Sequence, residues 1–199
     1  MTEVLSAKIL EWARSRSGRK LVTAQELLPF GSRAAIDQAL ARLHGRGELV
    51  RVVRGVYALP VEGKYGRHLP APAAVAEAIA ARRNESVVTH GAVAANRLGL
   101  TTQVPVREVY LTGGATQHVE VGRQQVELRH APAWQLVFPG APAGDVVRAL
   151  AWLGPARAHE AREQIRRTVP RAELEQLRAV TPVLPSWLAR EVVELAHAA

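Results

Sequence analysis

The feature that most constrains the fold is a β-rich run that follows helical patterns within the first 60 residues. Apolar residues recur at helical spacing from about Thr2 to Arg16, which predicts a first helix. The later run Glu48–Leu59 is rich in Val and other β-forming residues and is interrupted at Arg54-Gly55. Two such runs around a glycine turn predict a β-hairpin.

Two further helix signals lie between these elements. Thr23-Ala-Gln-Glu26 has the spacing of a capping box and predicts a short second helix, which Pro29-Phe-Gly31 must stop. Ser32 is expected to cap a third helix, whose buried face would carry Ile36, Leu40 and Leu43. Helix, short helix, turn, helix and hairpin is the order of a winged helix-turn-helix domain.

This order places polar and basic side chains where a DNA duplex would lie. With its apolar face buried, the third helix presents Arg33, Asp37, Gln38, Ala41 and Arg42 outward. The N-terminal part of such a helix enters the major groove, where Arg pairs with guanine and Gln with adenine. Hydroxyls and hairpin arginines would hold phosphates. The predicted DNA-binding residues are Thr23, Ser32, Arg33, Gln38, Arg42, Arg51 and Arg54.

The distribution of charge also favours residues 1–67 as the DNA-binding part of the chain. The 199 residues carry a formal net charge of +8, and residues 1–67 hold 12 Lys and Arg against 6 Asp and Glu, hence +6. Residues 68–199 hold 14 basic and 12 acidic side chains, hence +2. Aromatic residues make up only 5% of the chain. A basic, aromatic-poor segment favours binding to phosphates and grooves of double-stranded DNA over stacking on unpaired bases.

The pattern of the remaining sequence predicts an α+β protein with a domain boundary after residue 67. A Pro/Ala connector begins at His68 and leads to a mixed α/β region, 68–140, followed by a helical bundle, 141–199. Strands are expected at 87–89, 107–112, 118–121 and 124–130, with a hairpin turn at Gly122-Arg123. Helices are expected at 73–83, at 91–98 and from about 143, with breaks at 154–155, 170 and 182–185.

Composition excludes several classes of site. The absence of cysteine excludes disulfides, thiolate catalysis and sulfur-ligated zinc, and it fits a reducing cytoplasm. No apolar run is long enough to span a bilayer, and the N-terminus lacks the layout of a signal peptide. No catalytic, metal or cofactor motif is present. We therefore expect no enzyme and no cofactor, although His90, His118, Glu120 and His130 remain candidates for an unrecognised site.

The residues also carry a family resemblance. The segment Leu43–Tyr57, with its Gly-Glu-Leu-Val-Arg-Val-Val-Arg-Gly-Val-Tyr, resembles the helix-to-wing segment of AbiEi-type antitoxins of bacterial type IV toxin-antitoxin systems. Thr89–Pro105 and Val109–Gly114 resemble the start of the C-terminal domain in a short branch of that group. The resemblance spans about residues 23–155. It implies a DNA-binding antitoxin that represses its own operon and counters a nucleotidyltransferase toxin without a stable complex.

Two other functions compete with this interpretation. A solitary winged-helix regulator, or an adaptor that uses the domain to bind proteins, would have the same elements. The arginines of the C-terminal third, Arg157, Arg162, Arg166, Arg167 and Arg171, offer a second basic face, but glutamates are interleaved with them. Such alternation is typical of a solvent face held by ion pairs. The sequence leaves the oligomeric state open.

Overall fold

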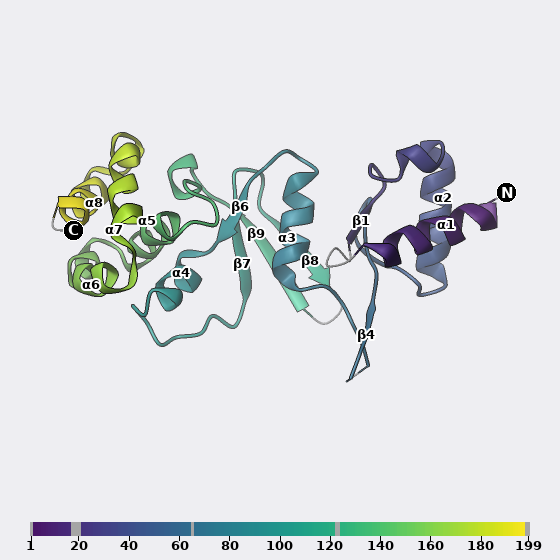
Figure 1. Ribbon diagram of the computed structural model, residues 1–199, viewed down its shortest axis with the longest axis horizontal. Coiled ribbons are helices and arrows are strands. Elements are labelled where there is room, and N and C mark those ends of the chain that lie inside the picture. The colour runs from purple at the N-terminus through teal and green to yellow at the C-terminus, as the bar shows by residue number, and fades with distance from the viewer. Residues whose placement is uncertain (1, 17–20, 65, 122–123, 198–199) are drawn as a thin grey trace. The chain divides into compact units, whose positions relative to one another are not determined.

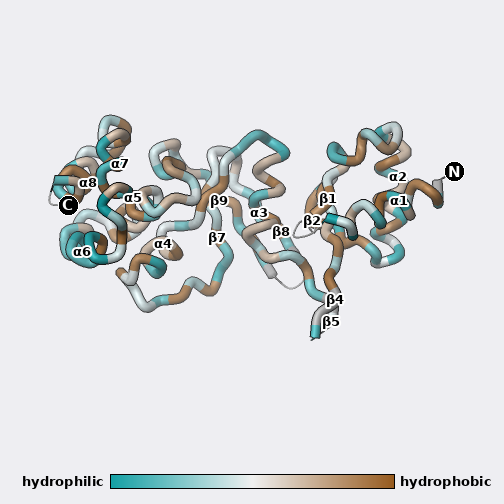
Figure 2. The backbone as a smooth tube through the Cα atoms, viewed as in Figure 1, coloured by the Kyte–Doolittle hydropathy of each residue, from teal (hydrophilic) through white to brown (hydrophobic). Residues whose placement is uncertain are grey.

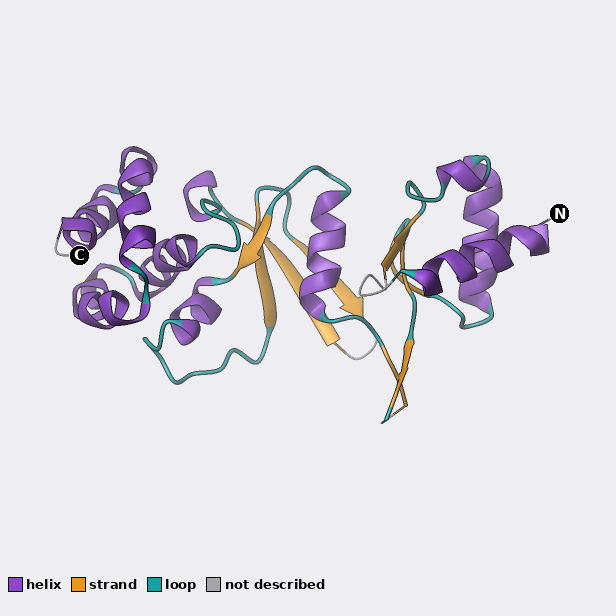
Figure 3. Ribbon diagram, viewed as in Figure 1, coloured by secondary structure: helices purple, strands orange, loops and turns teal. Residues whose placement is uncertain are grey.

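Helices and short strands alternate along the first two thirds of the chain, and helices fill the last third (Figures 1 and 3). The computed structural model describes residues 2–16, 21–64, 66–121 and 124–197. Within these residues the protein is mixed α+β, with eight α-helices and sheets of three, two and four strands. No helix of the described chain combines the length and apolar character needed to cross a membrane.

The chain forms two compact units. The first comprises residues 1–83 and 118–126, and the second comprises 84–117 and 127–199. The predicted turn at Gly122-Arg123, in the segment 118–126 of the first unit, lies outside the described residues. The boundary expected after residue 67 therefore falls inside the first unit.

The first unit begins with two helices packed on a three-stranded antiparallel sheet. Its core contains the completely buried side chains of Ile9, Leu27, Ile36, Leu40 and Leu43. The last three are the residues predicted for the buried face of the third helix, so this prediction is confirmed. The sheet has the order β1-β3-β2. The elements are α1 (Thr2–Ser15), β1 (Leu21–Thr23), η1 (Leu28–Phe30), α2 (Arg33–Gly45), β2 (Val50–Val53) and β3 (Val56–Ala58).

The prediction of a second helix is wrong, although both hydrogen bonds of the predicted capping box are present. The backbone N–H of Thr23 donates to Glu26 Oε2 at 2.9 Å, and the N–H of Glu26 donates to Thr23 Oγ1 at 3.3 Å. Thr23, however, pairs with Val56 as the last residue of β1, and the N–H of Ala24 donates to the carbonyl of Gly55. Only turns and the 3₁₀ helix η1 follow.

A hairpin and a helix complete this part of the first unit. The strands β4 (Val61–Gly63) and β5 (Gly66–His68) pair antiparallel and were missed by the sequence analysis. His68, expected to open the connector, is the last residue of β5. The connector then leads to α3 (Pro72–Ala81), which confirms the predicted alanine-rich helix. Its buried face carries Val75 and Ile79.

The strands and the short helix of the middle region follow the predicted order. The sheet has the order β6-β7-β9-β8, and Gly99, at φ +70°, directly follows α4 and its C-cap residue Leu98. Glycine tolerates this left-handed conformation, which explains why the helix stops there. The elements are β6 (Val87–Thr89), α4 (Gly91–Arg97), β7 (Glu108–Thr112), β8 (Gln117–Val121) and β9 (Gln124–His130).

The C-terminal helices end where the predicted breaks lie. They share one core with α4, in which Leu150, Ile165, Leu177, Leu188 and Leu195 are completely buried. Figure 2 shows that α6 is largely hydrophilic. Of its side chains, only those of Ala158, Ala161 and Ile165 are buried. The elements are η2 (Ala133–Gln135), α5 (Pro142–Leu153), α6 (Pro155–Thr168), α7 (Arg171–Gln176), η3 (Leu177–Val183) and α8 (Ser186–His197).

A buried arginine organises the second unit. The Arg148 side chain is 1% exposed, and its guanidinium donates to Asp145 Oδ1 at 2.8 Å and to the carbonyls of Gln135 and Val137. Asp145 also accepts from the Thr89 hydroxyl at 3.3 Å and pairs with Arg97. A buried charge is tolerated only when it is paired and hydrogen-bonded. These contacts therefore hold β6, α4 and the η2 segment against α5.

We predict that Gly91→Ala lowers the stability of the second unit. A Cβ at Gly91 would collide with the carbonyl oxygen of Arg148 and lie 2.6 Å from the Cβ of Trp152, so α4 and α5 would have to separate. Overpacking of this kind costs about 1–3 kcal/mol. Urea denaturation followed by tryptophan fluorescence measures the loss.

Gly113→Ala is the matched control, since a Cβ there makes an ordinary contact of 3.5 Å with Leu136 Cδ1. Its free energy of unfolding should stay within about 0.5 kcal/mol of the wild type. Equal stability of the Gly91→Ala variant and the wild type would show that the α4–α5 contact is not tight.

Candidate nucleic-acid interface

Helix α2 presents a fixed polar face because its start and its inner face are both defined. The Ser32 hydroxyl accepts from the N–H of Ala35 at 3.3 Å, which confirms the predicted N-cap. On the opposite side from the core, Arg33, Gln38 and Ala41 are exposed and Arg42 is half-buried. The structure thus brings Ser32, Arg33, Gln38 and Arg42 together on one helix, as predicted.

Arg33 is not a free cation on this face. Its Nε lies 3.1 and 2.9 Å from the two carboxylate oxygens of Asp37, one helical turn later. Both side chains are more than half exposed, so the pair is worth about 0.3–0.5 kcal/mol. Arg42 Nε donates to the carbonyl of Gln38 at 3.2 Å. Both arginines are thus engaged through Nε, but only Arg33 has its charge balanced by a carboxylate.

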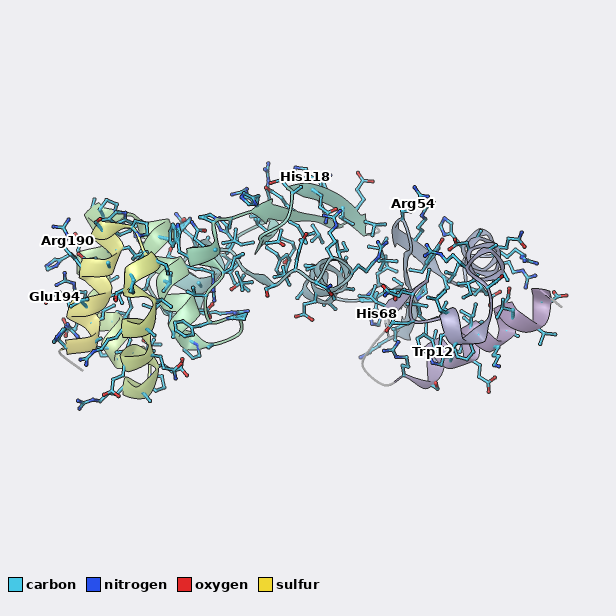
Figure 4. The ribbon with its side chains drawn as sticks, turned by 90° about the horizontal axis from the view of Figure 1, so that it is seen from above. Trp12, Arg54, His68, His118, Arg190 and Glu194 are labelled. Atoms are coloured by element: carbon cyan, nitrogen blue, oxygen red, sulfur yellow. The ribbon has the colours of Figure 1, made fainter. Side chains whose placement is uncertain are left out.

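The β2–β3 hairpin supplies two further predicted arginines. Gly55 in its turn has φ +80°, a conformation that glycine adopts without strain, and the register shifts between Arg51 and Val53. Arg51 on β2 is exposed, and so is Arg54 in the turn, which Figure 4 labels. Within the described chain neither side chain has a hydrogen bond or an ion pair. Their charge is therefore available to a ligand.

The hairpin turn is held from two sides by residues that sequence reasoning missed. Arg82, directly after α3, donates from Nη1 to the carbonyl of Arg54 at 2.7 Å. Its Nη2 would lie 3.3 Å from a Cβ placed on Gly55. The N–H of Ala24 donates to the Gly55 carbonyl at 3.2 Å. No local pattern in the sequence indicates the Arg82 contact, because its acceptor is a carbonyl 28 residues earlier.

Thr23 stands apart from the other predicted residues. It ends β1, and its hydroxyl donates to Glu26 Oε2 at 2.8 Å and accepts from the Glu26 N–H. Arg16 pairs with Glu26 at 2.8 Å as well. Burial raises the pKa of Glu26, but the hydrogen bonds from Arg16 and Thr23 outweigh it, so the pKa is lowered. The Thr23 hydroxyl thus serves this cap, and its phosphate contact stays a prediction.

The histidine candidates have local structural contacts. His90 Nδ1 accepts from the N–H of Ala92 at 3.2 Å as the N-cap of α4, and burial, reinforced by Arg129, lowers its pKa. His130 Nδ1 lies 3.1 and 3.0 Å from the carbonyls of Gly113 and Gly114. His118 and Glu120 are exposed, and Val119 between them in the sequence is buried. Among the described residues, no three His, Asp or Glu side chains gather as metal ligands.

The arginines of the C-terminal third are largely engaged by acidic or carbonyl groups. Arg162 Nε lies 2.7 Å from Glu191, Arg167 pairs with Glu163, and Arg171 pairs with Glu175 at 3.1 Å. Arg166 donates to the carbonyl of Glu194. These contacts make the second basic face an ion-paired surface, in contrast to the free arginines of the β2–β3 hairpin.

These features define an α+β protein with an exposed basic helix face and a basic hairpin turn in its first unit. The chain belongs to DUF6088, a family of unknown function, whose sequence profile matches residues 8–177. Among solved structures it is similar to the crystal structure of the RV2827C protein from Mycobacterium tuberculosis, with a TM-score of 0.55 and 16% sequence identity. That similarity covers 98% of this chain and 77% of the other, and it concerns the fold. No curated protein matches the chain.

We predict that acid weakens the first unit through Glu26. Because the pKa of Glu26 is lower in the folded chain than in the unfolded one, its contribution is present at pH values above the unfolded pKa, near 4.5. It is lost as the pH falls through the folded pKa. Glu26→Gln, which cannot ionise, should flatten this part of the curve of stability against pH, measured by denaturation between pH 7 and pH 3.

Thr23→Ala removes the hydroxyl that donates to the same carboxylate and should flatten the curve in part. Identical pH dependence of the Glu26→Gln variant and the wild type would exclude this role of Glu26.

Proposed function

We propose that the first unit is a winged helix-turn-helix that binds double-stranded DNA, and that the protein is an AbiEi-type antitoxin that represses its own operon. The observation that carries the DNA-binding part is the pair of free arginines on the β2–β3 hairpin beside an exposed polar face of α2. In this interpretation α2 is the recognition helix, and the β2–β3 hairpin is the wing.

The energies favour an exchange of partners at Arg33. The exposed Arg33–Asp37 pair is worth about 0.3–0.5 kcal/mol, and a bidentate contact between arginine and guanine discriminates against the wrong base by about 1–3 kcal/mol. The ion pair is therefore too weak to hold Arg33 away from a guanine. Gln38 needs no exchange, and its side-chain amide suits adenine. Arg51 and Arg54 would contact phosphates and add affinity on every sequence.

The second unit would act against the toxin. The resemblance of Thr89–Pro105 to the antitoxin C-terminal domain supports this role. The C-terminal helices would form its bundle, and the chain would work in the cytoplasm, without catalytic residues, metal or cofactor, against a nucleotidyltransferase that it does not bind stably. A solitary regulator or a protein-binding adaptor is the alternative that the experiments below separate.

We predict salt-dependent, sequence-dependent binding of the full chain to the DNA upstream of its own gene. Arg54→Gln should weaken binding to all sequences and lower the salt slope by about 1, because one phosphate contact is lost. Gln38→Ala should instead reduce the preference for the upstream DNA by about 1–3 kcal/mol. Fluorescence anisotropy at several salt concentrations, on upstream and shuffled duplexes, measures both.

Arg171→Gln is the control, because this arginine is equally exposed but belongs to the second unit and pairs with Glu175. It should bind DNA as the wild type does. Equal and weak binding to upstream and shuffled duplexes would contradict a specific repressor. Retention of a protein partner by a wild type that does not bind DNA would favour the adaptor.

We predict that a variant can lose repression and still neutralise the toxin. The variant Arg42→Gln/Arg54→Gln should lose repression of a reporter fused to its own promoter, yet still restore growth to cells that express an adjacent nucleotidyltransferase. The two activities would reside in different units, so changes on α2 and the hairpin leave the second unit intact. Failure of the wild type to restore growth would reject the antitoxin assignment and leave the repressor assignment standing.

A further inference from the structure

The β2–β3 turn has a backbone conformation that fixes the direction of one carbonyl. Strand β2 ends at Val53 and β3 begins at Val56, so Arg54 and Gly55 are the two central residues of the turn. Gly55 has φ +80°, whereas the φ of Arg54 is not positive. A positive φ at the second central residue alone is the pattern of a type II turn. Type I and type II turns differ in the orientation of the central peptide group, so the turn type determines where the Arg54 carbonyl points.

Arg82 covers this carbonyl with its guanidinium group. Its Nη1 donates to the carbonyl of Arg54 at 2.7 Å, and its Nη2 and Cζ would lie 3.3 and 3.6 Å from a Cβ placed on Gly55. The N–H of Ala24 donates to the carbonyl of Gly55 at 3.2 Å. Both carbonyls of the central residues therefore have a donor within the protein. Without Arg82, the turn would present a bare carbonyl oxygen, and its partial negative charge repels phosphate oxygens.

The charge of Arg82 is not balanced by this contact. A carbonyl is neutral, and no carboxylate of the described chain lies within ion-pair distance of Arg82. Glu77 on α3 lowers the local potential, but it lies five residues earlier, outside the i+3 and i+4 spacings that bring helix side chains together. Arg82 is exposed, and the hydrogen bond to Arg54 is the one that it makes with described residues, so the other N–H groups of its guanidinium are available to a ligand.

We propose that Arg82 is a further phosphate-contacting residue of the DNA interface. The turn then meets the DNA backbone with two arginines, Arg54 from the hairpin and Arg82 from the residue after α3. By holding the Arg54 carbonyl, Arg82 also positions the backbone that carries the Arg54 side chain. This inference rests on the proposed DNA-binding function. It extends the interface past the connector, beyond the segment 1–67 in which all the DNA-binding residues were predicted.

The test is a salt series of DNA binding by the full chain, measured by fluorescence anisotropy on upstream and shuffled duplexes. Arg82→Gln should weaken binding to both duplexes alike, by about fivefold to tenfold near 0.1 M salt, because one phosphate contact and its released counterion are lost. The slope of log K against log salt concentration should fall by about 1. Arg82→Lys keeps the cation and should retain most of the slope.

Arg178→Gln is the matched control. Arg178, in the second unit, is also exposed and also donates to a backbone carbonyl, that of Ala196, at 2.7 Å. This variant loses the same charge and the same kind of hydrogen bond, yet it should bind DNA as the wild type does. Circular dichroism verifies that each variant is folded. Equal weakening by Arg82→Gln and Arg178→Gln would show a general effect of net charge and would overturn the proposal.

The double variant Arg54→Gln/Arg82→Gln separates a phosphate contact of Arg82 from a role in positioning alone. Two independent contacts predict that the slope falls by about 2. If the double variant binds as Arg54→Gln does, Arg82 acts only through Arg54, and the proposed contact is overturned.

The same series distinguishes this inference from the function on which it rests. A wild type that binds DNA, with an Arg82→Gln variant of unchanged affinity and slope, rejects the Arg82 contact and leaves the DNA-binding function in place. A wild type that binds neither duplex rejects the DNA-binding function and the Arg82 contact together.

Discussion

The second unit depends on how the charge of Arg148 is compensated. A cation that is 1% exposed loses its hydration, and removing one partner of such a buried pair typically costs about 3–5 kcal/mol. Asp145, the carbonyls of Gln135 and Val137, and the Thr89 hydroxyl have to be present together. The close packing at Gly91 and Gly144 follows, since a Cβ at either glycine would collide with the backbone that carries this network.

The first unit depends on a different constraint, the two hydrogen bonds that carbonyls of the β2–β3 turn accept from residues outside the hairpin. The carbonyl of Gly55 accepts from the N–H of Ala24, which ties the residue after β1 to the turn. The carbonyl of Arg54 is used by Arg82, which places a cation next to the turn. These two contacts fix the backbone on which the Arg54 side chain stands. They also tie the turn to the residue after β1 and to the residue after α3.

Local signals in the sequence predicted most elements, and contacts between distant residues account for the rest. Ser32, Gly99, Gly154-Pro155 and Pro170 define helix ends by their own chemistry, and the structure confirms all four. Strand β1 has only three residues and exists because β3 pairs with it, so no periodicity could reveal it. Arg148 was missed as a buried residue because a charged side chain in a helix normally predicts an exposed face. Arg82 was missed because its partner is a carbonyl 28 residues earlier.

Net charge is an incomplete guide to an interface, because an arginine held by a carboxylate attracts a phosphate less. In the first unit Arg16, Arg33 and Arg46 have acidic partners, and the net charge of +6 for residues 1–67 already counts those acids. Among the arginines predicted to bind DNA, Arg51 and Arg54 have no side-chain partner among the described residues. In the C-terminal third, Arg162, Arg167 and Arg171 are paired. The proposed nucleic-acid interface is therefore defined by the position of Arg51 and Arg54 on one hairpin, where no other described residue pairs with them, more than by the total charge of the chain.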